Sequence, residues 1–532
     1  MFVFCLFLLF VVVHGTPMYV SVKGKDDKTC GGEKNPCKSL QTALNNADKN
    51  SETVINIEQG TFSGKENCKL DFTNPKVQFQ GKPNKSGALP ELKCDGKNML
   101  VKTALKQRFQ VKSVQFTNVS LISSSHEYIS IESCKFLASS VATSGGETHI
   151  NKCEFDENNH VHLLPYAVYV EAGQLMLSKT KIVGYEIGLK ATKRAHINGE
   201  TNQFTKSRYG VDLNDVEWNL IGDWKFEKCS NASINAIDSK IGAAIHGYTL
   251  DNGFNITVDG GHGVHLKSSK FWFRHAGGGG VFVLRNVHSP LFAALDIDSK
   301  SSFQMDKKLY PTGGIYITNS TQVRTGIKIT DSSATLFNVV ISDNGNDATL
   351  PSNFAAIEVN QGSLTMDTAT ITNNQWRSLH AVNMSTVVVL DSVFASNVAN
   401  LSTIIVDSSE LNFHDTRFFR NYYDIRRQPA VVPAGVFMVM NQGKLMLAGS
   451  ILQDNGFSPQ GIQGNGASAF SCTDSSIRLL QSKISETQPL PTIVCDKCNF
   501  YDSQSVVKGT QRGCIQTTTT TPHTSPALTK TK

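Results

Sequence analysis

Three residues in the middle of the chain could do proton-transfer chemistry on a sugar. His262 lies between two glycines in Gly261-His262-Gly263, and Arg324 and Lys328 follow in VRTGIKI. A lyase that acts on acidic sugars uses an arginine or lysine to abstract the proton next to the carboxyl group, and histidine transfers protons near neutral pH. If the chain is an enzyme, His262, Arg324 and Lys328 are its candidate catalytic residues.

The carboxylates that such chemistry needs are not evident from their spacing. Hydrolysis of a glycosidic bond uses at least two carboxylates held a fixed distance apart, but the acids nearest to His262 are Asp251 and Asp259. A lyase would need carboxylates that bind calcium, and the candidates near Lys300 and Arg324 are Asp296, Asp298 and Asp306. Ordinary surface charge explains these acids equally well, so calcium is expected only under the lyase alternative.

Other cofactor and partner classes are excluded by their missing motifs. His262 and His265 are spaced as H-x-x-H, with His246 and His275 nearby, but no acid motif adjoins them, so we predict no metal site. Gly277–Gly280 is not followed by GK[ST], which makes tight turns the better interpretation than a phosphate loop. The net charge is +6 without a basic stripe, so we predict no nucleic-acid partner.

A repeated phrase indicates the scaffold that carries these residues. A branched or aromatic apolar residue is followed three places later by Asn or Asp in Ile341/Asn344, Ile371/Asn374, Phe394/Asn397, Phe418/Asn421 and Ile451/Asp454. A looser version runs upstream through Phe116, Phe136, Phe155, Ile182, Phe204 and Phe226. Repeats of roughly 20–30 residues predict a solenoid in which the apolar residues stack inward. The asparagines are expected to stack at a turn and to hydrogen-bond amide to amide.

The segments between the repeated phrases have the residue pattern of β-strands. Segments such as YISIESCKF, GIKITDSSATLF and STVVVLDSVF alternate apolar and polar residues between Gly, Asn, Asp and Ser clusters. A propeller blade needs a longer repeat than this chain shows, and a sandwich has no reason to repeat its sequence. We therefore predict an all-β, single-stranded parallel β-helix over residues 54–505, with longer loops at 240–320 and 424–437.

The two ends of the chain have different compositions. Residues 1–15 are an apolar run that indicates a secretory signal peptide, and no later stretch is long enough to span a membrane. Residues 16–53 predict an N-terminal cap of a strand, a disulfide loop and a short helix in SLQTALNNA. Residues 506–532 are rich in Thr and Pro and are expected to form a disordered tail.

Cysteines and sequons fit an exported protein. We expect bridges Cys30–Cys37 and Cys68–Cys94, and a bridge between Cys134 and Cys153, which precede equivalent phenylalanines on successive repeats. Cys229 is left over as a buried thiol. The pairing of the last four cysteines, or their use as zinc ligands, stays open: Cys472, Cys495, Cys498 and Cys514. Seven N-x-S/T sequons predict glycosylation at Asn84, Asn118, Asn231, Asn255, Asn319, Asn383 and Asn400.

The repeats resemble those of the right-handed parallel β-helix, pectin-lyase-like superfamily. Small-small-apolar turns precede several copies, as in Gly313–Tyr316, Ala355–Glu358 and Ala434–Phe437. This combination is similar to the repeats of chlamydial polymorphic outer-membrane proteins and of secreted protist β-helix proteins. The resemblance implies a right-handed β-helix with a surface or adhesive role, and it carries over no catalytic residues. The paired aspartates that polygalacturonase-like enzymes have before their GHG motif are missing here.

We therefore expect a secreted, glycosylated β-helix protein that binds a polysaccharide or cell-surface glycan without catalysis. Regularly repeating side chains on flat faces suit an extended polymer, and the aromatics that could stack on sugars are Trp272, Phe273, Trp376, Tyr422 and Tyr423. One alternative is a carbohydrate-active enzyme, a uronate lyase or a polygalacturonase-like hydrolase, with its cleft within residues 240–330. The other is a structural matrix or coat component.

Overall fold

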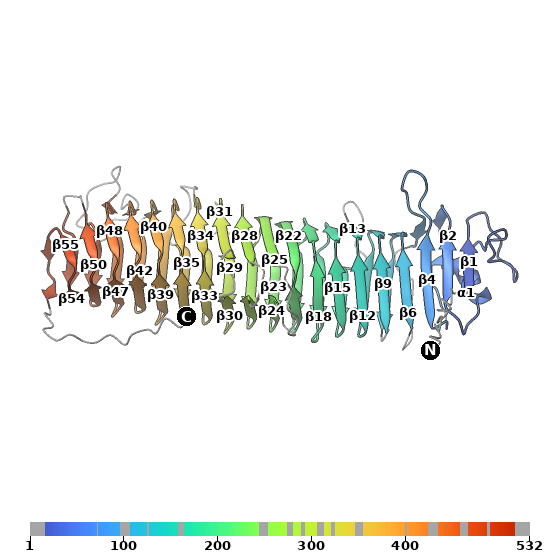
Figure 1. Cartoon of the computed structure of the whole chain (residues 1–532), viewed down its shortest axis with the longest axis horizontal. Helices are drawn as coiled ribbons and strands as arrows, with labels where there is room; N and C mark the ends of the chain where they lie inside the picture. The colour runs from blue at the N-terminus through green and yellow to red at the C-terminus, as the bar shows by residue number, and fades with distance from the viewer. Residues whose placement is uncertain are drawn as a thin grey trace, which may run out of the picture. The chain divides into compact units, whose positions relative to one another are not determined.

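The computed structural model describes residues 16–71, 73–95, 107–124, 127–157, 164–243, 254–273, 280–288, 293–305, 313–320, 325–345, 355–399, 402–423, 435–457, 467–486 and 490–516. The chain divides into two compact units, Met1–Glu217 and Trp218–Lys532. Both units consist mainly of short strands that pair in parallel (Figure 1). The all-β parallel β-helix predicted from the sequence is confirmed.

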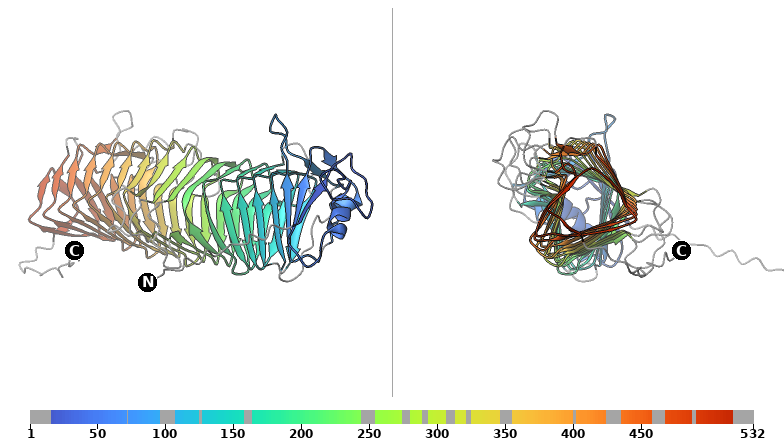
Figure 2. Two further views of the ribbon diagram at one scale, coloured as in Figure 1. Left: turned by 45° about the vertical axis from the view of Figure 1, so that its right-hand side comes forward. Right: turned by 90° about the vertical axis from the view of Figure 1, so that its left-hand side faces the viewer.

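From β6 (Arg108–Lys112) onward, each coil of the first unit has three strands, one on each of three faces. One coil contains β9 (Tyr128–Glu132), β10 (Lys135–Leu137) and β11 (Ser140–Ser144), and the next contains β12 (Glu147–Asn151), β13 (Glu154–Asp156) and β14 (Tyr166–Glu171). Each strand pairs in register with the strand one coil later, β9 with β12, β10 with β13 and β11 with β14 (Figure 2). We call the faces of β9, β10 and β11 the first, second and third face.

The corners between these strands are short. Ser133 and Ala138 join β9 to β10 and β10 to β11, with φ angles of 54° and 46°. A single residue in the left-handed region reverses the chain direction sharply, and the small residue that follows packs inside the corner. The sequence therefore uses Ser, Asn, Asp, Ala and Lys at corners that ordinarily favour glycine.

The core of the first unit is built from the predicted apolar column on the second face. Phe116, Phe136 and Phe155 lie in register on β7 (Gln115–Thr117), β10 and β13, and each is fully buried. Their rings stack at centroid distances of 4.9 and 4.3 Å. The column continues to Ile182 and Phe204. Each buried side chain contributes about 1.5–3 kcal/mol relative to an exposed one.

The first coils are accompanied by two short helices. Helix α1 (Leu40–Asn46) forms where the sequence predicts one, with the Ser39 side chain accepting a hydrogen bond from the Thr42 N–H at its start. It buries Leu40, Ala43 and Leu44 and contacts β1 (Thr16–Val20) and β2 (Thr53–Ile57). Helix α2 (Lys65–Cys68) follows β3 (Thr61–Phe62). No helix in the described ranges is long and apolar enough to cross a membrane. A capping role for α1 stays a prediction.

The second unit repeats the same three-sided coil. One coil has β32 (Thr325–Thr330) on its third face, β33 (Ser333–Phe337) on its first and β34 (Val339–Ser342) on its second. The next has β35 (Ala355–Asn360), β36 (Ser363–Asp367) and β37 (Thr370–Thr372), each paired in register with its counterpart. Strands β55 (Val506–Lys508), β56 (Gln511–Arg512) and β57 (Ile515–Gln516) carry the coils beyond the expected boundary at residue 505.

A ladder of asparagines runs along one corner of the second unit. Asn344, Asn374, Asn397 and Asn421 are essentially fully buried. The Nδ2 of each donates to the Oδ1 of the asparagine one coil later, at 2.9–3.0 Å for the Asn344, Asn374 and Asn397 donors. Each Nδ2 also donates to a main-chain oxygen, as from Asn397 to the carbonyl of Ile371 at 2.8 Å. The predicted amide-to-amide stacking is confirmed.

The last predicted member of the ladder was placed one residue too early. Leu452, not Ile451, is in register with Phe418, and Ile451 is 38% exposed. Asn455, not Asp454, accepts the hydrogen bonds of Asn421. In a strand a shift of one residue moves every side chain to the other face. Ile451 and Leu452 are both apolar, so the local sequence alone fits either register.

The ladder ends on a carboxylate. The N–H and Nδ2 of Asn455 donate to the two oxygens of Glu486, at 2.6 and 3.2 Å. Burial raises the pKa of Glu486 to about 7, against these hydrogen bonds, which lower it. A raised carboxyl pKa stabilises the fold below the unfolded value of 4.5 and loses that contribution as the pH rises through about 7.

We therefore expect Glu486 to make the protein less stable at pH 8 than at pH 5, by an amount on the order of 2 kcal/mol. Glu486→Gln cannot ionise, so its melting temperature should change less between the two pH values than that of the wild type. Thermal unfolding followed by circular dichroism at pH 5 and pH 8 measures both differences. An unchanged pH dependence in Glu486→Gln would contradict this account.

Four disulfides staple the ends of the described chain. Cys30–Cys37 and Cys68–Cys94 form as predicted. The connectivity left open at the other end is Cys472–Cys498 and Cys495–Cys514. These bridges use all four cysteines that could have held zinc. Cys229 is a buried thiol that belongs to none of these four bridges, as predicted.

The predicted bridge between Cys134 and Cys153 does not form. Both are buried free thiols at equivalent corners of successive coils, and burial together with the neighbouring Cys153 raises the pKa of Cys134. Side chains that project in parallel from adjacent strands keep their Cβ atoms about 4.8 Å apart, beyond the ~3.5–4.5 Å of a disulfide. Cys472 and Cys495 are likewise in register and bond elsewhere.

Candidate functional site

The third face of the second unit carries a column of charged side chains. Five neighbouring strands form this part of the face, β26 (Val264–Lys267), β29 (Ala293–Asp298), β32, β35 and β38 (Arg377–Val382). The outward residues at the same register position, one per strand, are His265, Asp296, Lys328, Glu358 and His380. We call this set the charged column. Its members follow one another at the strand spacing of about 4.8 Å.

The column sits on a rigid and narrow base. The inward neighbours Ile327, Ile329, Ile357 and Val359 are fully buried, which fixes the alternation of the strands and the outward direction of the column. The residues that border it on one side are small, as in Gly326, Ala356 and Ser378. A Cβ at Gly326 would lie 2.6 Å from the carbonyl oxygen of Ala356, so the strands approach closely there.

The charges in the column alternate and are partly shielded from water. Asp296 is 7% exposed, and burial raises its pKa while His265 and Lys328 lower it. Burial, and then the positive charge of Arg377, lower the pKa of His380 to about 4, so its imidazole is neutral at pH 7. The Nδ1 of His265 lies 3.2 Å from Oδ1 of Asn235 on β23 (Ala232–Ile237). The column can therefore present a protonatable carboxyl, an ammonium, a second carboxylate and neutral imidazole.

The structure describes two of the three predicted catalytic residues, Lys328 and His262. Lys328 is the centre of the charged column. His262 lies at the corner before β26, where its main-chain oxygen accepts hydrogen bonds from the N–H and Oγ of Ser233. Burial, and then His288, lower the pKa of His262. Arg324 lies outside the described residues, as do Asp306, Asp251, His246 and His275. Among the described residues, no cluster of three or more His, Cys, Asp or Glu could hold a metal ion.

Sequence reasoning named two acids of this face, Asp296 and Asp298, and missed Glu358 and His380. The signal was present in the small–apolar turns that begin each third-face strand. Aligning these turns puts one outward residue after each apolar position, in GVH, ALD, GIK, AIE and SLH. The column runs from His265 to His380. Two aromatics expected to stack on sugars, Trp376 and Tyr423, are buried at 3% and 1% exposure.

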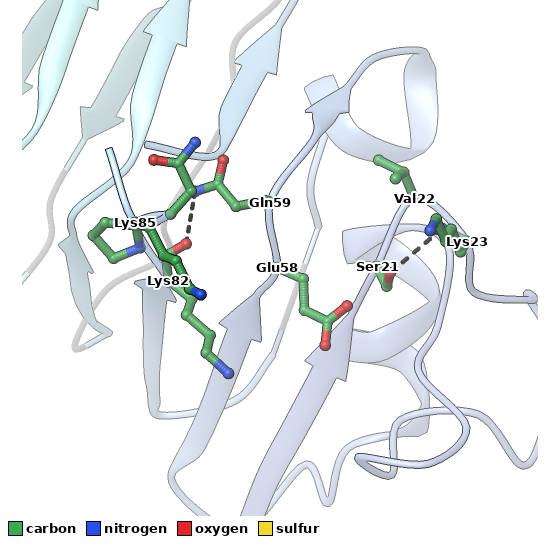
Figure 3. Close-up of a pocket in the computed structure, with 9 residues that line it drawn as sticks. Ser21, Val22, Lys23, Glu58, Gln59, Lys82 and Lys85 are labelled. Carbon is green, nitrogen blue, oxygen red and sulfur yellow. Dashed lines mark hydrogen bonds between the residues drawn. The ribbon is translucent and has the colours of Figure 1, made fainter. Parts of the chain in front are cut away.

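The first unit has a separate lysine-lined pocket of about 440 Å³. Its walls follow the ends of β1, β2 and β4 (Lys76–Gly81), and Figure 3 shows Lys23, Lys82 and Lys85 around it together with Glu58. The Gln59 Nε2 donates to the carbonyls of Lys82 and Ala88, at 2.7 and 2.8 Å. These bonds join the segment that follows β2 to the segment that follows β4. The pocket is positive, and its three lysines are exposed to solvent.

Comparisons with known proteins find only remote structural likenesses. No family model and no curated protein matches the chain. A solved structure of the GH136 lacto-N-biosidase from Eubacterium ramulus matches at 10% identity, covering 92% of this chain and 67% of that one, with a TM-score of 0.19. Tailspike protein 3 of bacteriophage CBA120 matches at 11% identity, with coverage of 85% and 53% and a TM-score of 0.15. The mannuronan C-5 epimerase AlgE6 A-module from Azotobacter vinelandii matches at 10%, with coverage of 89% and 95% and a TM-score of 0.14. These TM-scores carry no argument about the fold or the site.

Proposed function

We propose that this chain is a secreted, glycosylated protein that binds an extracellular polysaccharide along the third face of its second unit, without cleaving it. The observation that supports this is the charged column, five polar side chains at one fixed spacing on adjacent strands. A polymer laid across the coils meets the same spacing at every step. A packed β-helix holds such side chains without loss of order on binding, which favours affinity.

The chemistry of the column suits hydroxylated and acidic sugars. Lys328 offers three N–H donors between two carboxyl groups, and Glu358 offers acceptors for sugar hydroxyls. His265 and His380, at the two ends, add imidazole groups that hydrogen-bond without a net charge when neutral. Alternating donors and acceptors select the orientation of a polymer as well as its composition.

The test is retention on polysaccharides. The full chain, secreted from a eukaryotic host, is passed over immobilised plant, bacterial and host polysaccharides, with an endoglycosidase digest to check the sequons. Retention on one polymer is expected, and Lys328→Met should weaken it about tenfold or more, because a hydrogen bond to a charged group contributes about 1.5–3 kcal/mol. Lys483→Met, an exposed lysine on the second face, is the matched control and should leave retention unchanged. Retention on no polymer, or equal retention of Lys328→Met, would refute the proposal.

One observation favours hydrolysis as a second candidate function. Asp296 and Glu358 flank Lys328 in the column, two strands apart, which corresponds to about 9.6 Å between their Cα atoms. Inverting glycosidases hold their two carboxyl groups about 6.5–9.5 Å apart, with the acid kept protonated by a raised pKa. The raised pKa of Asp296 gives it the role of the acid. New reducing ends from a bound polymer that disappear in both Asp296→Asn and Glu358→Gln would establish this function in place of binding alone.

A further inference from the structure

Beside the charged column, strand β38 begins with a run of buried polar atoms that lack partners. Within the described part of the chain, no hydrogen-bond partner exists for Nε of Arg377, Oγ of Ser378 or Nδ1 of His380, nor for Nε1 of Trp376 just before the strand. The Arg377 residue is 7% exposed and Ser378 is 1% exposed. Oγ1 of Thr325, also without a partner and 1% exposed, belongs to the same face.

These atoms share one location. Thr325, Ala355 and Arg377 are in register on β32, β35 and β38, so Thr325 and Arg377 flank the small side chain of Ala355. Ser378 follows Arg377 and precedes the buried Leu379. Burial lowers the pKa of Arg377, and Glu358 is close enough to oppose that change by raising it. The group therefore lies at the edge of the charged column.

Unpartnered polar atoms at this density are unusual in a folded protein. More than nine in ten buried polar groups have a hydrogen-bond partner, because leaving one unsatisfied costs about 1–3 kcal/mol. A buried guanidinium without a hydrogen-bond partner costs more free energy than a neutral polar group in the same situation. Elsewhere in the second unit such atoms occur singly, as at Trp218 Nε1, Thr330 Oγ1 and Ser402 Oγ, whereas four lie within residues 376–380. A group of them at one strand start calls for an explanation, and a ligand that supplies the missing partners is one.

The kinds of atom define what that ligand must offer. The Arg377 Nε and the Trp376 Nε1 can only donate, and the hydroxyls of Ser378 and Thr325 can donate. The partner must therefore be rich in acceptors. A planar guanidinium with its Nε free binds an oxyanion side-on through two parallel hydrogen bonds.

We propose that Arg377, Ser378 and Thr325 form a binding site for an oxyanion, the carboxylate or sulfate group of an acidic polysaccharide. This inference rests on the proposed function and names the ligand class of that site: an acidic rather than a neutral polymer. The oxyanion accepts from the guanidinium and the hydroxyls, and the sugar to which it is attached continues along Glu358 and Lys328.

The first test uses small anions on the full-length secreted protein. Sodium sulfate and sodium acetate are titrated at constant ionic strength against sodium chloride, and the melting temperature is followed. A saturable rise with one of the two anions is expected for the wild type, because a ligand that binds only the folded state stabilises it. The rise should vanish in Arg377→Met and shrink in Ser378→Ala and Thr325→Val. Arg417→Met, an exposed arginine on the second face, is the control for the general effect of sulfate.

The second test uses polymers and separates the two proposals. Polygalacturonate, dextran sulfate and dextran carry a carboxylate, a sulfate and no charge. Preference for one acidic polymer over dextran, with a loss of about 10- to 100-fold in Arg377→Met, supports the inference. If the wild type binds all three polymers equally, the inference of an acidic ligand is overturned and the proposed function stands. The same follows if the wild type and Arg377→Met bind one acidic polymer equally. A third outcome is that a small anion raises the melting temperature saturably, Arg377→Met abolishes this rise, and no polymer binds. That outcome supports the oxyanion site and refutes the polysaccharide function.

Discussion

Replacing Asn397 with alanine is expected to lower the free energy of unfolding of the second unit by about 3–5 kcal/mol. The Asn397 Oδ1 accepts from the N–H and Nδ2 of Asn374, at 3.1 and 3.0 Å. Its own Nδ2 donates to the carbonyl of Ile371 and to Oδ1 of Asn421, at 2.8 and 2.9 Å. Alanine removes all four bonds at a position with 0% exposure, leaves two buried donors without an acceptor and opens a cavity.

Thermal and denaturant unfolding measure this loss, with hydrogen exchange as a local readout. The amide of Asn374, which donates to Asn397, should lose protection before amides in the first unit. Asn412→Ala is the matched control, because the Asn412 Nδ2 bonds only to the exposed carboxylate of Glu410, at 3.0 Å, and its loss should stay within about 0.5 kcal/mol. Equal effects of the two substitutions would show that the ladder does not stabilise the coils.

Replacing Arg377 with methionine is expected to raise the free energy of unfolding by about 1–3 kcal/mol in the absence of ligand. The Arg377 Nε is buried without a partner, and burial lowers the pKa of its guanidinium, which indicates that the charged form is poorly accommodated. Methionine fills a similar volume, needs no hydrogen bond and restores the apolar character of the corner. A gain in stability joined to a loss of binding is typical of a residue kept for function.

The melting temperature of Arg377→Met in chloride buffer, compared with that of the wild type, shows directly whether the substitution stabilises or destabilises the protein. Arg417→Met, which changes an exposed side chain on the second face, should leave it nearly unchanged. A fall of the melting temperature in Arg377→Met of the size expected for a broken buried ion pair would show that the guanidinium has a structural partner. The oxyanion site would then lose its physical basis.

Most of the fold could be predicted from the sequence because successive coils of a β-helix are alike, so residues with the same role recur at a regular spacing. Phe116, Phe136 and Phe155 recur at one position because each must fill the same place in the core, and Asn344, Asn374, Asn397 and Asn421 because each satisfies the next. The prediction failed where two registers bury similar side chains, at Ile451 and Leu452. It also failed at Cys134 and Cys153, because a Cα separation suits a disulfide only when the side chains converge.

The site was harder to predict because its members are not alike. His265, Asp296, Lys328, Glu358 and His380 share a register position but no residue type, so a search for repeated residues passes over them. Lys328, Asp296 and His265 were named in advance, from charge, spacing and neighbourhood in the sequence, whereas Glu358 and His380 were not. Arg377 carried no signal, since an arginine at a strand start is ordinarily exposed and its burial is a property of the folded corner.

The corners of the second unit differ in their tolerance of length. One residue, Asn338, joins β33 to β34, and two residues join β32 to β33, whereas residues 343–354 separate β34 from β35. From β32 onward the longer connections lie at one edge, the edge where each third-face strand begins, so length can change there without shifting the register of a coil. Earlier in the unit they also separate first-face from second-face strands, as between β24 (Lys240–Ala243) and β25 (Phe254–Gly261). Natural variants and designed libraries could diversify the third-face edge one coil at a time, next to the charged column, while the scaffold stays constant. The chain has in effect separated the part that can evolve new recognition from the part that must fold.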